Sequence, residues 1–199
     1  MISFLKIFLP LYAVVFVLIV VLWRTVALWK RTGINAYAQL RQQQGVHGVI
    51  SRYYRGLPLC SALTIILFIT PWYSALSPIS GLEHSVFQYV GIGLLFLSLV
   101  WISVAQIQMG NAWRIGIDSN NQAGLVTHGI FTASRNPIFL GIKLNSLGFF
   151  LILPNALTFA VLLVGVVLIH IQVALEEEYL LSTYGDKYKE YCLQVRRWI

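Results

Sequence analysis

The sequence is poor in charge. Only 11% of its 199 residues are Asp, Glu, Lys or Arg, whereas 58% are hydrophobic. Globular domains carry roughly 25% charged residues, so this chain has too few charges to cover a surface that faces water. The apolar residues fall in long blocks, and about 20 helical residues suffice to cross the hydrocarbon core of a bilayer. The composition therefore excludes an ordinary soluble domain and predicts a membrane protein.

Several common motifs are absent. The two cysteines, Cys60 and Cys192, form no CxxC motif and lie in an apolar block and a charged tail, so we expect neither a disulfide nor a metal site. The sequence also lacks GxGxxG, GxxxxGK and HExxH, the signatures of common soluble nucleotide and zinc sites. The net charge of +7 does not indicate a nucleic-acid partner, because the basic residues cluster between the apolar blocks.

The apolar blocks predict an all-α fold, a polytopic membrane protein with about five transmembrane helices. The first block is long and lacks a small-residue cleavage site, which favours an uncleaved span over a signal peptide. Only Pro154-Asn155 separates the last two blocks, and this turn-forming dipeptide predicts a helical hairpin. The blocks are residues 4–29, 57–76, 87–107, 138–153 and 156–175.

The loop charges predict the orientation, because Lys and Arg accumulate in cytoplasmic loops. The loop at 77–86 contains Glu83 and no Lys or Arg, which places it outside. An odd number of spans then puts the N-terminus outside and the C-terminus inside. A bacterial cytoplasmic membrane is the simplest location, and the endoplasmic reticulum is the alternative. The loop after the first span is basic and contains no acid; its cations are Lys30, Arg31, Arg41, Arg52 and Arg55.

The tail at 176–193 has aromatic and aliphatic residues spaced by three or four. This spacing predicts an amphipathic helix that lies on the membrane surface or folds back over the spans. Gly185 is a point at which that helix could be interrupted.

Two polar clusters stand at predicted helix ends. Pro137 suits the first turn of a helix, so Arg135 and Asn136 should lie at the cytoplasmic entrance of the fourth span. Arg135 could bind an anion or simply anchor to lipid phosphate, and Asn136 could cap the helix. The acids at 176–178 repel one another and predict a cationic partner, either Arg135 or a bound cation. For Glu178, a solvated helix end is an equal alternative.

Within the spans, His170, Ala174 and Glu177 share one helical face, which could form a polar seam. An interhelical hydrogen bond is the simpler interpretation of His170, and Lys143 could snorkel to the membrane surface.

Together the clusters resemble the superfamily of isoprenylcysteine carboxyl methyltransferases and phospholipid methyltransferases. Over residues 105–199, the segment 129–141 resembles that family's Gly-aromatic-Arg-His-Pro stretch, and the tail resembles its later Glu-Glu motif. The region of Trp113 and Arg114 is also similar. Asn136 departs from the family's His and cannot be protonated near neutral pH. The matching tail residues are Glu176, Glu177, Leu180, Gly185, Tyr188, Tyr191, Val195 and Arg197.

The resemblance implies a single membrane domain, 1–199, with N-terminal spans and a basic loop in 1–104 and a cofactor-binding core in 105–199. It implies S-adenosylmethionine as cofactor and a lipophilic or membrane-embedded acceptor, whose methylated atom is a carboxylate oxygen, thiol, amine or hydroxyl. Arg135 and Glu177 are the expected catalytic residues. The expected cofactor-binding residues are Gly129, Phe131, Arg135, Asn136, Pro137, Glu176, Glu177, Tyr188 and Tyr191.

Two alternatives stay open at this point. One is an NADPH-dependent reductase of related membrane architecture. The other is a non-catalytic membrane protein with a degenerate cofactor site, which the replacement of the family's His by Asn136 would favour.

Overall fold

The computed structural model describes residues 1–33, 45–110 and 124–199. Within these ranges the regular secondary structure is helical, apart from one isolated bridge between Pro78 and Asn155. This confirms the predicted all-α fold. Arg41 of the basic loop and the segment around Trp113 and Arg114 lie outside the described residues.

The first predicted span is a nearly continuous helix. It comprises α1 (Ile2–Phe16), a π-helical stretch η1 (Val17–Trp23) and α2 (Arg24–Thr32). Gly33, with φ of 69°, ends it in the left-handed conformation that glycine adopts without steric cost. Residues Ile2–Arg31 are long and apolar enough to cross a membrane.

The second predicted span was placed too far along the chain. Helix α3 covers Gly45–Ile69, and the two 3₁₀ turns η3 (Pro71–Leu76) and η4 (Ser80–Leu82) follow it. Thr70 adopts extended backbone angles because the residue before a proline is biased away from the α-helical conformation. The prediction used hydropathy alone, and the apolar residues continue past this boundary.

The C-terminal half contains α4 (Ser85–Met109), the 3₁₀ turn η6 (Gly129–Thr132), α5 (Pro137–Ile152), α6 (Ala156–Tyr184) and α7 (Asp186–Gln194). Helices α4 and α6 are long and apolar enough to span a membrane, whereas α5 is apolar but shorter. Together with the N-terminal helix, α4 and α6 give three candidate spans among the described residues.

The predicted hairpin is present. Asn155 begins α6 through a capping box, in which its side chain accepts from the Thr158 backbone N–H while its own N–H reaches the Thr158 hydroxyl. Helix α6 does not end near 175 but continues through the three glutamates to Tyr184. Gly185, with φ of 53°, then separates it from α7, so the predicted tail helix is divided at the expected glycine.

Helices α4 and α5 pack most extensively of all helix pairs. Where they cross, a Cβ on Gly91 would lie 2.6 Å from the Gly148 carbonyl oxygen, and one on Gly148 would lie 2.8 Å from that of Gly91. Small residues at a crossing allow membrane helices to approach closely. The crossing therefore holds α5, which leads from the polar cluster at Arg135, firmly against α4.

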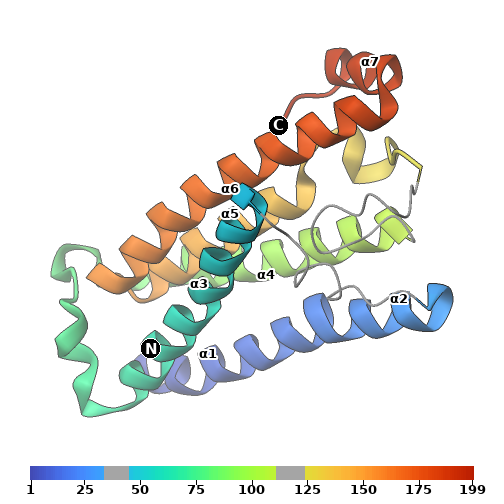
Figure 1. Ribbon diagram of the computed structural model, residues 1–199. Helices are drawn as coiled ribbons and strands as arrows, with labels where there is room; N and C mark the ends of the chain where they lie inside the picture. Colours follow the sequence, from blue (N-terminus) through green and yellow to red (C-terminus); the bar gives the residue numbers. More distant parts are fainter. Residues whose placement is uncertain (34–44, 111–123) are drawn as a thin grey trace.

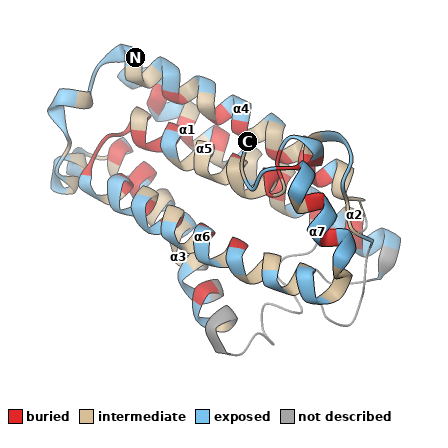
Figure 2. Ribbon diagram, turned by 90° about the horizontal axis from the view of Figure 1, so that it is seen from above, coloured by how far each residue is buried: buried red, intermediate tan, exposed pale blue. Residues whose placement is uncertain are grey.

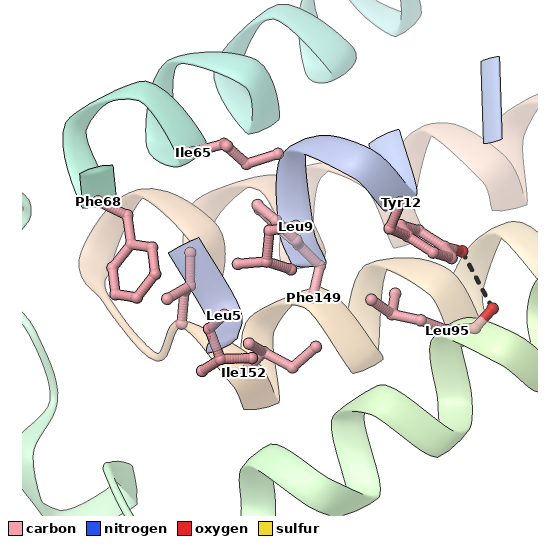
Figure 3. Packing of buried hydrophobic residues seen from close by; sticks show 9 residues of the cluster. Leu5, Leu9, Tyr12, Ile65, Phe68, Leu95, Phe149 and Ile152 are labelled. Atoms are coloured by element: carbon pink, nitrogen blue, oxygen red, sulfur yellow. Dashed lines mark hydrogen bonds between the residues drawn. The ribbon is translucent and has the colours of Figure 1, made fainter. Parts of the chain in front are cut away.

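The largest buried apolar cluster lies at the end of the bundle where α5 turns into α6 (Figure 3). Here Leu5 and Leu9 of α1 meet Phe68 of α3 and Ile152 of α5. The Ile79 N–H donates to the Pro154 carbonyl at 2.8 Å, so the connection between α3 and α4 lies at this same end.

The opposite end of the bundle carries η6, α7 and the C-terminal residues (Figure 1). Viewed from above, α7 lies beside the C-terminal part of α6 (Figure 2). Two residues of α7, Tyr188 and Tyr191, are buried. The sequence thus places apolar packing at one end and its charged motifs at the other.

Candidate active site

Arg135 lies just before α5 and joins three parts of the chain. Its Nε and Nη2 atoms donate to Glu177 Oε1 at 3.4 and 3.2 Å, which links it to α6. Its Nη1 donates to the carbonyl oxygens of Val195, at 2.9 Å, and Cys192, at 3.2 Å. The pairing expected between Arg135 and the glutamates of the hairpin is therefore present.

The Glu177 carboxylate is the centre of the cluster. Besides Arg135, its Oε1 accepts from Asn136 Nδ2 at 3.1 Å. Its Oε2 accepts from Arg197 Nη2 at 2.7 Å and Nε at 3.1 Å, two charge-assisted bonds to one oxygen. The Glu177 side chain is only 12% exposed. The hydrogen bonds that Arg197 donates to Glu177, and the negative charge of this carboxylate, raise the pKa of Arg197.

Asn136 occupies the N-cap position of α5, but its side chain makes no capping hydrogen bond. The prediction that it caps the helix was therefore wrong. Its carboxamide turns instead to Glu177 and, at 3.4 Å, to the Arg197 carbonyl. Pro137 follows at the first helical position, as predicted, where an N–H would have no partner within the helix.

Glu176 lies on a different side of α6 from the paired Glu177. It follows Ile169 and Val173, both buried, at helical spacing, so it shares the face of α6 that packs into the bundle. Among the described residues, no Lys or Arg forms an ion pair with Glu176. Glu178 is exposed, which fits the solvated alternative.

Tyr188 and Tyr191 are the buried residues through which α7 packs against the segment that precedes α5. They are 3% and 6% exposed and pack with Val195. The Tyr191 hydroxyl donates to the Phe131 carbonyl at 2.6 Å, and burial raises the pKa of Tyr191 to about 12. The Tyr188 hydroxyl is buried, and no described residue forms a hydrogen bond with it.

Gly129 and η6 are positioned by a residue that the sequence-based site omitted. The Ile130 N–H donates to Gln108 Oε1 of α4 at 2.6 Å. Gly129 has φ of 62°, and a Cβ there would collide with the Gln108 side chain. The available signal was a polar residue near the end of an apolar span.

The C-terminal segment is a second part of the site that the prediction underestimated. The Arg135 N–H donates to the Arg196 carbonyl at 3.0 Å, and the Ser134 hydroxyl donates to the Arg197 carbonyl at 3.3 Å. Arg197 was noted only as part of a motif and was not expected to pair with Glu177. The position of a basic residue shortly after an amphipathic helix was the only sequence feature that could have predicted this pairing.

The proposed polar seam does not continue from Glu177 as one network. His170 is instead 2.9 Å from Lys143 of α5, an interhelical contact of the kind expected for a membrane histidine.

The part of the chain that contains the Arg135–Glu177 pair matches a known family. The family model described as phospholipid methyltransferase matches residues 86–187. The chain belongs to the phospholipid methyltransferase family. Its three candidate spans and this membership make it an integral membrane protein. The matched region contains both halves of the Arg135–Glu177 pair, whereas Tyr188, Tyr191 and Arg197 lie beyond it.

A curated relative supports the wider superfamily that the motifs resembled. The chain is 32% identical over 112 residues to the protein-S-isoprenylcysteine O-methyltransferase of Schizosaccharomyces pombe. The match covers 54% of this chain and 47% of the relative, so the chain spans about half the length of the curated relative it matches.

Proposed function

We propose that this protein transfers a methyl group from S-adenosylmethionine to a lipophilic acceptor in the membrane. The observation that carries the proposal is the cluster of Arg135, Asn136 and Glu177, which joins the two motifs of the family at one end of the α5–α6 hairpin. Membership of a methyltransferase family supports the same chemistry.

The unpaired groups of the site fit the polar groups of this donor. Glu176 is an acid on the inner face of α6 without a cationic partner among the described residues, and it would meet the donor's ammonium group. The buried Tyr188 hydroxyl lacks a partner in the same part of the structure and would bind a polar atom of the donor. Burying such groups is costly unless a ligand satisfies them.

Arg135 and Glu177 are the residues on which we expect activity to depend most. A guanidinium has five N–H donors, and the four bonds to Glu177, Cys192 and Val195 leave one for a carboxylate of the donor or acceptor. Glu177 positions Arg135 and, through Arg197, the C-terminal segment. Gly129, Phe131, Asn136, Pro137 and Tyr191 complete the proposed cofactor site by shaping the backbone around Arg135.

S-adenosylmethionine supplies an electrophilic methyl group on a sulfonium centre. The protein's part is then mainly to hold donor and acceptor in line, and well-oriented reactants can gain several kcal/mol from proximity alone. This requires no strong general base, so Asn136 can replace a histidine at the motif without removing the proposed chemistry.

The basic first loop supports an orientation with the Arg135–Glu177 end in the cytoplasm, where the donor is made, and the N-terminus outside. The arrangement fits, because the N-terminal residues pack against the α5–α6 turn at the far end of the bundle. The acceptor would enter from the bilayer, and a bacterial cytoplasmic membrane remains the proposed location.

Calorimetric titration of the detergent-purified protein with S-adenosylmethionine and its demethylated product tests the proposal. We expect binding in the micromolar range that Arg135→Ala and Glu177→Ala abolish. Lys187→Ala, which removes an exposed charge from α7, is the matched control and should bind as the wild type does. Wild-type protein that bound NADPH instead of the methyl donor, or neither, would overturn the proposal.

A further inference from the structure

A second polar cluster lies away from Glu177, between α5 and α6. The Lys143 Nζ atom is 2.9 Å from His170 Nε2 and 3.2 Å from the centre of the Trp198 ring. The rings of His170 and Trp198 are themselves 5.3 Å apart. Two helices and the C-terminal segment thus converge on one lysine.

This cluster lies deeper in the bundle than the Arg135–Glu177 pair. Lys143 is about 9 Å beyond Pro137 along α5, and His170 is about 10 Å from Glu177 along α6. The 16 residues of α5 extend about 24 Å, less than a hydrocarbon core of about 30 Å. With Pro137 at the membrane entrance, Lys143 is expected below the headgroups, where the surroundings are apolar.

The charge of Lys143 is not neutralised by the protein residues around it. None of the described residues places a carboxylate in an ion pair with it, in contrast to Arg135. Its neighbours are a neutral imidazole that accepts a hydrogen bond and an aromatic face that attracts a cation. A cation at membrane depth is costly, and such residues characteristically mark binding sites for ions or substrates.

Snorkelling does not account for this geometry. A lysine that snorkels extends along its own helix toward the headgroups. The Lys143 ammonium instead contacts α6 and lies against the Trp198 ring, while the contact with His170 remains on the exposed side of the hairpin. An anion that approached from the bilayer could reach it.

We propose that Lys143, His170 and Trp198 form a binding site for the anionic headgroup of a lipophilic molecule that enters from the bilayer between α5 and α6. The ammonium supplies the charge, and His170, whose Nε2 accepts from the ammonium, supplies the N–H of its other ring nitrogen, Nδ1, as a donor. Trp198 holds the ammonium in place and covers the apolar stem of Lys143. If the proposed methyl transfer is correct, this molecule is the acceptor, and a carboxylate or phosphate is the group that positions it.

The test measures lipid selectivity by electron paramagnetic resonance in phosphatidylcholine nanodiscs without a methyl donor. The probes are spin-labelled stearic acid and its uncharged methyl ester, with spin-labelled phosphatidic acid and phosphatidylcholine as a second pair. We expect the wild type to immobilise one or both anionic probes several-fold more strongly than the neutral partners. Selectivity in the first pair identifies a carboxylate ligand, and selectivity in the second identifies a phosphate lipid.

Lys143→Met should remove this selectivity, Lys143→Arg should retain most of it, and Lys187→Met should leave it unchanged. Trp198→Leu provides an independent variant, which should reduce selectivity without removing a charge. Equal selectivity in wild type and Lys143→Met, or a wild type without selectivity, would overturn this site. Because no donor is present, a failure here is separate from a failure to bind S-adenosylmethionine, which would overturn the proposed function alone.

Discussion

The two ends of the bundle are held together by different forces. At one end, Leu5 and Leu9 pack against Phe68 and Ile152, contacts that any well-fitting apolar side chain can supply. At the other end, Glu177 accepts directed bonds from Asn136 and two arginines. Substitutions at the apolar end should therefore change stability alone, whereas substitutions at the polar end should change both stability and ligand binding.

The largest expected effect follows from Glu177→Leu, which leaves Arg135 and Arg197 without their shared carboxylate. Removing one partner of a buried ion pair costs about 3 kcal/mol or more, and we expect the lower figure because Arg197 is 46% exposed. Thermal unfolding in detergent should show a lower midpoint, and titration should show no methyl-donor binding. A variant that kept both would show that this pair is dispensable.

A purely structural effect is expected for Leu9→Ala at the apolar end. Leu9 is 1% exposed, and truncating such a side chain costs about 2 kcal/mol or more through lost contacts and a cavity. The unfolding midpoint should fall while the affinity for the methyl donor stays unchanged. Ile7→Ala, at a 73% exposed position two residues away, is the control and should alter neither. Loss of donor affinity in Leu9→Ala would contradict the separation of the two ends.

Asn136 tests how much of the polar end depends on hydrogen bonding alone. Asn136→Leu removes the bonds to Glu177 and the Arg197 carbonyl and should cost about 1 to 2 kcal/mol, with weaker donor binding. Asn136→His, which introduces the residue typical of the family, should retain binding because an imidazole N–H can donate to the same carboxylate. Parallel calorimetric titrations distinguish them, and equal losses in both variants would contradict this role.

The smallest expected effect concerns Tyr191, whose hydroxyl bonds the Phe131 carbonyl. Tyr191→Phe should lower stability by about 1 kcal/mol, and Tyr89→Phe at an exposed site should not.

Tyr191 also predicts a dependence on pH. Its pKa is raised from 10.0 to about 12, so the folded protein holds this proton more tightly than the unfolded chain does. The resulting stability is complete below pH 10 and is lost as the pH rises toward 12. Thermal unfolding midpoints of wild type and Tyr191→Phe should therefore converge over that interval. A constant difference would contradict the raised pKa.

The helices were predictable from sequence because apolar blocks and turn residues determine them locally. The hairpin at Pro154-Asn155 and the interruption at Gly185 were both recognised in this way. The end of α3 was not, since the apolar residues continue through Pro71 and only the backbone bias before proline stops the helix.

The site was predictable only where the hairpin itself brings residues together. Arg135 and Glu177 lie at the open end of two antiparallel helices that one tight turn joins, so their pairing follows from topology. The bonds from Arg197 and the position of Trp198 depend on how α7 folds back, and no local pattern specifies that path. The rotation of Asn136 away from the helix it begins likewise depends on the carboxylate of a distant segment.

The reversal at Gly185 makes the site depend on two separate packing contacts. Arg197 lies 20 residues after Glu177 in the chain, on the far side of α7. The hairpin alone brings Arg135 to Glu177, whereas the second guanidinium reaches the same carboxylate only because α7 folds back. A hairpin with α7 undocked would therefore hold its carboxylate with one arginine, and the docking of α7 completes the site.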